Sequence, residues 1–353
     1  MKHNRFAVLD GLRGIAALIV LIFHLVQQHS LALLPYAWLA VDFFYVLSGF
    51  VVAFAYEQRL RTGEVSIAGF FRVRVIRLYP LILLGTAAGI AFAFVAVFAK
   101  KTISMAECLE AGTLGLLLLP SFVIPRWATA YPFNMASWSL TFEVFVNVVY
   151  GLIAKNLTNG RLLFLTLVSA IGLIWLVSVN QGIGGGNLQD GWAFGFIRVM
   201  FPFFAGVLIY RNRPQVRRNS LASVGLMAGL AVMLFASWPA FMVVSALYVL
   251  VLFPAIVFVG SALSVAPRIS SFCTFVGAIS YPLYILQGPV LRVGDEMLKH
   301  LHLDGWRVFA FGAIEGGVVI AVAWLGLKFF DEPVQRMLRG LSTTSALPLG
   351  QRP

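Results

Sequence analysis

Long apolar stretches, separated by short polar or basic connections, occupy most of the 353-residue chain. A transmembrane α-helix needs about 20 predominantly apolar residues, and ten stretches come close to that length or exceed it. They are residues 9–28, 38–56, 78–99, 136–154, 162–179, 192–210, 220–237, 240–262, 271–291 and 307–330. The pattern predicts an all-α integral membrane protein with about ten transmembrane helices.

A further apolar segment, residues 112–124, is too short to span a bilayer and is interrupted by Pro120. We expect this segment to be re-entrant or interfacial. Lysine and arginine are enriched in the cytoplasmic loops of membrane proteins. With 112–124 counted as non-spanning, the basic connections fall on one side of the bundle, except for Lys100 and Lys101, so both termini are predicted to be cytoplasmic.

Composition agrees with a membrane protein, because 60% of the residues are hydrophobic and only 11% are charged. A soluble domain carries about 25% charged residues. The net charge of +12 would suggest a nucleic acid partner in a soluble protein. Here the basic residues lie between apolar stretches, so we expect a lipid bilayer as partner and no nucleic acid. The widely separated Cys108 and Cys273 indicate neither a metal site nor a disulfide framework.

The first predicted helix carries two ionisable residues, Arg13 and His24, which are eleven positions apart. That spacing is about three helical turns, so the two side chains lie on nearly the same face. Ionisable residues inside a membrane segment are costly and usually functional. The alternative is that Arg13 extends to the lipid headgroups while His24 bonds to a neighbouring backbone group.

The predicted topology places five polar residues in the outer half of the bundle, where they could share one cavity. They are His24, Asp42, Ser48, Glu143 and Arg198. Histidine is a suitable general base near neutral pH, and Asp42 or Glu143 could orient its imidazole. Glu143 and Ser48 could instead make only helix-packing contacts.

Four arginines are expected at the cytoplasmic end of the bundle: Arg13, Arg72, Arg74 and Arg77. A guanidinium group can bind phosphate with two hydrogen bonds. Arg74 and Arg77 are three positions apart and become neighbours if the third helix begins early. Anchoring by the positive-inside rule is the alternative explanation for these arginines.

Six short motifs are distributed along most of the chain. They are LDGLRGIAA at 9–17 with His24, VDFFYVLSGF at 41–50, FRVRVIRLYP at 71–80, SWSLTFE at 137–143, SYPLYIL at 280–286 and DEPV at 331–334. In this order they resemble the acyltransferase-3 family of bacterial multi-pass membrane O-acyltransferases. One difference is Gln287, where members of that family commonly carry a histidine, so His24 is the histidine best placed for chemistry.

The resemblance implies a membrane domain over residues 1–340, a cytoplasmic tail at 341–353 and a location in the bacterial inner membrane. We expect this domain without the hydrolase-like domain that some members carry. It implies transfer of an acyl group, often acetyl from acetyl-coenzyme A, to a hydroxyl of a carbohydrate or glycoconjugate.

The resemblance and the predicted depths together suggest roles for the polar residues. Arg13, Arg72, Arg74 and Arg77 would bind the phosphates of acyl-coenzyme A. Ser48, Trp138, Arg198 and Tyr284 would contact the substrates. His24 would accept the proton of the acceptor hydroxyl, or His24 or Ser48 would carry the acyl group in a two-step reaction. The alternative function is a solute or proton-coupled transporter, which internal charges and a proline-broken segment also suit.

Overall fold

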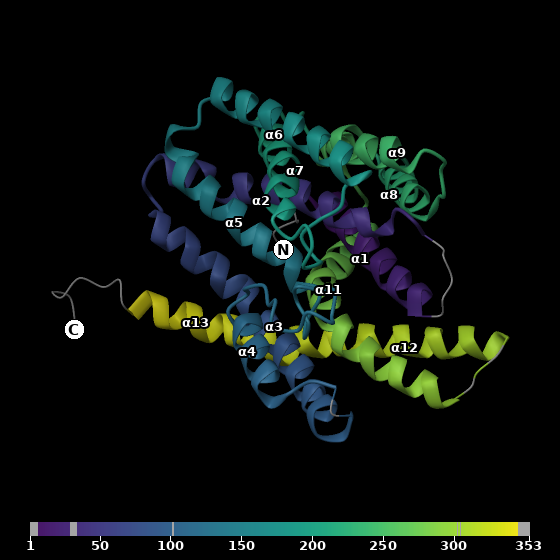
Figure 1. The fold of residues 1–353 in the computed structure, drawn as a ribbon. Coiled ribbons are helices and arrows are strands. Elements are labelled where there is room, and N and C mark those ends of the chain that lie inside the picture. Colours follow the sequence, from purple (N-terminus) through teal and green to yellow (C-terminus); the bar gives the residue numbers. More distant parts are fainter. Residues whose placement is uncertain (1–5, 29–33, 101, 302, 304, 345–353) are drawn as a thin grey trace.

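The computed structural model describes residues 6–28, 34–100, 102–301, 303 and 305–344, which form a bundle of helices (Figure 1). Within these residues, nine helical segments are long and apolar enough to cross a membrane, and α8 is a shorter apolar helix. The ten predicted helices therefore correspond to ten observed helical segments. The prediction of an all-α membrane protein is confirmed.

The first half of the bundle consists of six α-helices with short helical extensions. They are α1 (Ala7–Gln28), η1 (Ala37–Leu39), α2 (Ala40–Arg61), α3 (Ile67–Val95), η2 (Ala96–Lys100), α4 (Met105–Leu116), α5 (Ser137–Ile153), η3 (Ala154–Asn156) and α6 (Asn159–Asn180).

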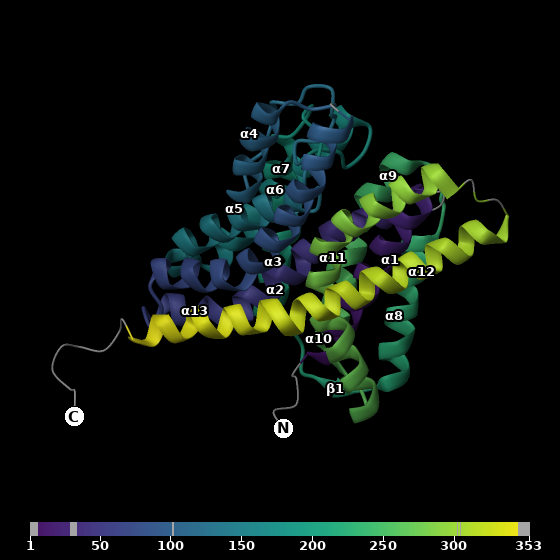
Figure 2. The ribbon, with the colours of Figure 1, turned by 90° about the horizontal axis from the view of Figure 1, so that it is seen from below.

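The second half contains the remaining helices and one short parallel strand pair. Its elements are α7 (Phe194–Arg211), β1 (Arg217–Arg218), α8 (Ser220–Phe235), α9 (Phe241–Leu247), η4 (Tyr248–Leu252), α10 (Phe253–Ser261), β2 (Leu263–Ser264), α11 (Pro267–Leu301), α12 (Trp306–Leu325), η5 (Gly326–Asp331) and α13 (Glu332–Thr344). Figure 2 shows α12, η5 and α13 as one long yellow rod along one side of the bundle.

Several helices are longer than their apolar stretches. The α3 helix begins at Ile67 rather than near residue 78, because the Ser66 hydroxyl accepts a hydrogen bond from the Gly69 amide at 3.0 Å and the arginine-containing turns before residue 78 are helical. The apolar stretch that begins at residue 78 left Arg72, Arg74 and Arg77 outside the third predicted helix, whereas all three lie on α3, so the third helix does begin early. Similarly, α11 continues through Asp295 and His300, beyond the apolar stretch that ends at residue 291.

Residues 112–124 do not form a spanning helix. They comprise the last turn of the 12-residue α4 and a non-helical segment after it. The directions of the later helices test this expectation independently. If residues 112–124 crossed the membrane, every later helix would run in the opposite direction relative to the first three. Instead α2 and α7 run parallel, as the pairs Asp42–Arg198 and Glu57–Arg211 show. The expectation that this segment does not cross is thus confirmed.

The α2 and α7 helices approach each other so closely that their backbones touch. A Cβ atom added at Gly206 would lie 2.1 Å from the carbonyl oxygen of Val46, and one added at Gly49 would lie 1.9 Å from that of Phe203. Small residues allow such approaches between membrane helices, where van der Waals packing replaces the hydrophobic effect. This interface fixes the relative position of two helices that carry site residues.

We predict that Gly206→Ala lowers stability by about 1–3 kcal/mol, the usual cost of overpacking a close interface. Gly225→Ala on α8 is the matched control, because no atom of the described residues lies within 4 Å of a Cβ atom added there. Thermal unfolding of the two variants in detergent measures the difference. Equal midpoints for the two variants would contradict the close α2–α7 contact.

Candidate functional site

Two cavities lie along α1 and α11, one after the other. The first, which we call the arginine cavity, has a volume of about 130 Å³ and is lined by Arg13, Ser48, Arg74, Arg77, Glu143 and Tyr284 among others. The second, the histidine cavity, has a volume of about 720 Å³ and is lined by His24, Trp38, Trp138, Arg198, Tyr284 and Gln287 among others. Tyr284 and Val41 line both cavities, so the two adjoin.

Glu143 is the centre of the polar contacts in the arginine cavity. Its Oε1 accepts hydrogen bonds from the Ser48 hydroxyl and from Nη2 of Arg74, both at 2.7 Å. The Arg74 side chain is buried. The α3 and α5 helices run antiparallel, as the contacts Arg74–Glu143 and Phe70–Gly151 show. The carboxylate therefore neutralises a buried guanidinium and holds a serine hydroxyl.

The remaining arginines of the predicted phosphate site have different surroundings. Arg13 donates from Nη2 to the Asp10 carboxylate and to the Gly277 carbonyl of α11, each at 2.9 Å. Arg77 is exposed and lines the cavity. Arg72 is also exposed but lines neither cavity, because it points away from the face of α3 that carries Arg74. The structure thus does not bring Arg72 into this group.

A second ion pair lies beside the histidine cavity. Arg198 bonds to both oxygens of Asp42, with Nε–Oδ1 and Nη2–Oδ2 distances of 2.8 and 2.6 Å. Asp42 is fully buried and Arg198 is 1% exposed. The rings of Trp38 and Trp138 lie 4.9 and 5.1 Å from the guanidinium carbon, close enough for cation–π attraction. Arg198 is therefore held on three sides.

His24 has neither carboxylate as its partner. Its imidazole lies beside the backbone of Val20 and the side chain of Gln287, and its Nδ1 makes no hydrogen bond to the residues that the structure describes. The prediction that Asp42 or Glu143 orients His24 is wrong, because each carboxylate is bound to an arginine. The prediction of one shared polar cavity is also wrong. Parallel packing of α1 on α11 turns His24 towards Gln287, while the carboxylates of α2 and α5 face α7 and α3.

At the boundary between the cavities lie two residues, Tyr45 and Ser139, that were not among the site residues predicted from the sequence. The hydroxyls of Tyr284 and Ser139 are 2.9 Å apart, and Tyr45 donates to the Ser139 carbonyl at 3.0 Å. Tyr45 lies three positions before Ser48, and Ser139 lies four before Glu143. Tyr45 and Ser139 could therefore have been identified from the sequence, because residues three or four positions apart lie on the same face of a helix.

Comparison with known proteins identifies the class of protein that contains these two cavities. A family model of an acyltransferase domain, Acyl_transf_3, matches residues 6–327. The chain belongs to the acyltransferase-3 family. It is a multi-pass membrane acyltransferase.

Two curated relatives resemble parts of the acyltransferase. Protein 2 in picA locus from Rhizobium radiobacter is 33% identical over 181 residues, which are 48% of this chain and 94% of the relative. Acyltransferase MdmB from Streptomyces mycarofaciens is 31% identical over 149 residues, 39% of this chain and 36% of that relative. The matched part thus spans just over a third of the second relative. No solved structure matches the acyltransferase.

We predict that Asp42→Asn mainly destabilises the acyltransferase, by about 3–5 kcal/mol, because it leaves the buried Arg198 without a counter-charge. The double variant Asp42→Leu with Arg198→Met, which removes both charges, should recover much of that loss. Unfolding in detergent provides the comparison. A stable but inactive Asp42→Asn enzyme would instead indicate that Asp42 acts directly in the reaction.

Proposed function

We propose that the acyltransferase moves an acyl group, acetyl in the simplest case, from acyl-coenzyme A to a hydroxyl of a carbohydrate or glycoconjugate. The observation that carries this proposal is the adjoining pair of cavities, of which one is rich in arginine and the other contains His24 between aromatic side chains.

The arginine cavity suits the donor. At about 130 Å³ it is smaller than the roughly 300 Å³ at which pockets begin to enclose a drug-sized ligand. Only the thioester end of coenzyme A would therefore enter, while its phosphates remain outside. Arg74 and Arg13 are already paired with carboxylates. We assign the main phosphate contact to Arg77, whose side chain is exposed at this cavity.

The histidine cavity suits the acceptor. Tryptophan rings offer apolar faces to the C–H groups of a sugar, and the polar tips of Tyr284 and Gln287 can bind its hydroxyls. In the proposed reaction, the acceptor oxygen attacks the thioester carbonyl beside Tyr284. A C–O bond forms, the C–S bond breaks, and His24 passes the hydroxyl proton to the departing thiolate. Gln287 would orient the imidazole.

A two-step reaction through Ser48 has one supporting contact, the hydrogen bond from Ser48 to Glu143. A carboxylate in that position could activate the serine as a nucleophile. We favour direct transfer, because Ser48 lines only the arginine cavity and not the cavity that contains His24. We also propose that the arginine cavity faces the cytoplasm of a bacterial inner membrane, where acyl-coenzyme A is made.

We predict that His24→Ala lowers acetyl-coenzyme A turnover by about 10²–10⁴-fold, the usual contribution of a general base. The measurement is release of free coenzyme A by purified protein in lipid, with a panel of glycoside acceptors. A matching elution profile on size exclusion controls for folding. Full activity of the variant would overturn the role of His24, and counterflow of a labelled solute without thioester loss would indicate a transporter.

We predict that Arg77→Ala raises the KM for acetyl-coenzyme A by about tenfold or more with little change in kcat, because a charge-assisted phosphate contact contributes about 1.5–3 kcal/mol. Arg72→Ala is the matched control, since both arginines are exposed on α3 and Arg72 lines neither cavity. An equal rise in KM for both variants would mean that general positive charge, rather than a specific contact, attracts the donor.

A further inference from the structure

A third cavity extends the space next to His24. It has a volume of about 480 Å³ and is lined by Phe92, Val95, Thr102, Trp127, Arg292 and Glu296 among others, and we call it the tryptophan cavity. Thr129 and Arg292 line both this cavity and the histidine cavity. The two spaces therefore adjoin along the loop after α4 and the later turns of α11. The proposed reaction does not use the tryptophan cavity.

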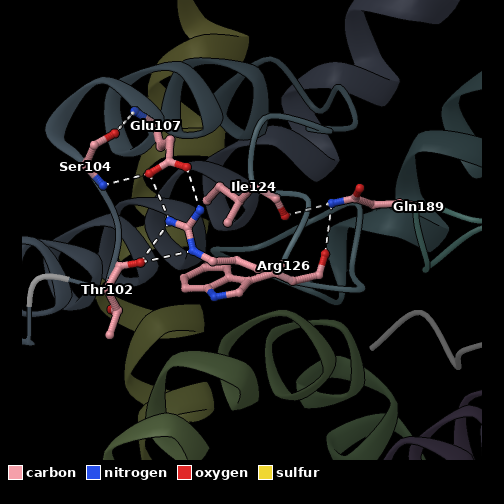
Figure 3. Close-up of polar contacts among 7 residues, drawn as sticks. Thr102, Ser104, Glu107, Ile124, Arg126 and Gln189 are labelled. Carbon is pink, nitrogen blue, oxygen red and sulfur yellow. Dashed lines mark hydrogen bonds and ion pairs between the residues drawn. The ribbon is translucent and has the colours of Figure 1, made fainter.

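The loops that form the tryptophan cavity are held by a network of polar contacts (Figure 3). Arg126 donates to both oxygens of Glu107 at 2.7 and 2.9 Å, and to the Thr102 carbonyl at 2.8 and 3.1 Å. Hydrogen bonding to Arg126 lowers the pKa of Glu107 to about 2, so this pair stays ionised at neutral pH. Both Thr102 and the chain before Trp127 are thereby fixed.

Gln189 fixes the same loop from the other side. Its Nε2 donates to the carbonyls of Ile124 and Trp127 at 3.1 and 2.9 Å, and the backbone of its own loop bonds to Ala128 and Ala130. The Trp127 ring packs edge-on against Phe133, with ring centres 6.4 Å apart. The indole is thus positioned by two segments that are far apart in the sequence, as expected of a preformed binding site.

The side chains around the tryptophan cavity have two chemical characters. Phe92, Val95 and Trp127 provide an apolar, partly aromatic wall. Thr102, Arg292 and Glu296 provide hydroxyl and charged groups. A sugar ring matches this combination, because its C–H face can stack on an indole while its hydroxyls bond to polar side chains.

We propose that the acceptor is a glycan of at least two sugar units. The reacting sugar occupies the histidine cavity, the next sugar occupies the tryptophan cavity, and the linkage between them passes Thr129 and Arg292. Cavities of about 720 and 480 Å³ both fall in the range of roughly 300–1,000 Å³ that is usual for ligand sites. The inference rests on the proposed function and narrows its acceptor.

The decisive variant fills the tryptophan cavity without touching the histidine cavity. Val95 is 50% exposed on α3 and lines the tryptophan cavity, so Val95→Trp can fill space without displacing a buried side chain. Val75→Trp is the matched control, since Val75 lies on the same helix, is 48% exposed and lines none of the three cavities. Trp127→Ala is a second variant that removes the stacking surface instead.

The assay compares acetyl transfer to methyl glycosides of glucose, mannose and N-acetylglucosamine with transfer to disaccharides that end in the same sugars. We expect the unmodified enzyme to prefer a disaccharide. Val95→Trp and Trp127→Ala should each lower kcat/KM for that disaccharide by about tenfold or more, with less than about a twofold change for the methyl glycoside. Val75→Trp should change neither value.

Equal use of both acceptor types by the unmodified enzyme would overturn the inference, and so would an equal effect of Val95→Trp on both. Preference for a glycoside with an apolar aglycone would overturn it in favour of an apolar second group. Each of these results leaves transfer to a carbohydrate intact. Failure of the proposed function is a different result, because no glycoside of either length would then stimulate coenzyme A release.

Discussion

Every ionised side chain inside this bundle has to be neutralised where it is buried, and that requirement determines how the site is built. An unpaired buried charge costs several kcal/mol, whereas a paired one is tolerated. Asp42 with Arg198 and Glu143 with Arg74 satisfy the requirement, and each pair joins helices that are distant in the sequence. The pairs therefore act as fixed points that align α2 with α7 and α3 with α5.

The sequence predicted the fold well because its signal is local. Each apolar stretch is about as long as a helix must be to span a bilayer, and the positions of the basic connections indicate which stretches cross the membrane. Helix ends were predicted less well, since the arginine-containing turns at 67–77 and the part of α11 beyond residue 291 continue a helix although charged residues interrupt their apolar pattern. Hydropathy detects the membrane-spanning part of a helix, while hydrogen bonds determine where the helix ends.

The site was predicted only in part. Motifs selected Arg13, His24, Ser48 and Glu143, and the structure places all four beside cavities. The partner of each charged or polar side chain was not predictable, because the depth of a residue in the membrane does not determine which neighbouring helix its side chain contacts. Asp42 and His24 have similar expected depths, but Asp42 faces α7 and His24 faces Gln287 on α11. Such contacts depend on how the helices pack side by side, and this packing cannot be read from the hydropathy pattern of a single sequence.

Division of the polar residues between two cavities has a chemical advantage for an acyltransferase. Water competes with the acceptor for a thioester, so a transferase benefits from a narrow donor site that excludes water until the acceptor is in place. The arginine cavity is the smaller of the two, at about 130 Å³ against about 720 Å³, and the contact between Tyr284 and Ser139 lies at its boundary with the histidine cavity. Under the proposed assignment of donor and acceptor, His24 would meet the thioester only across that boundary, next to the hydroxyl it would activate.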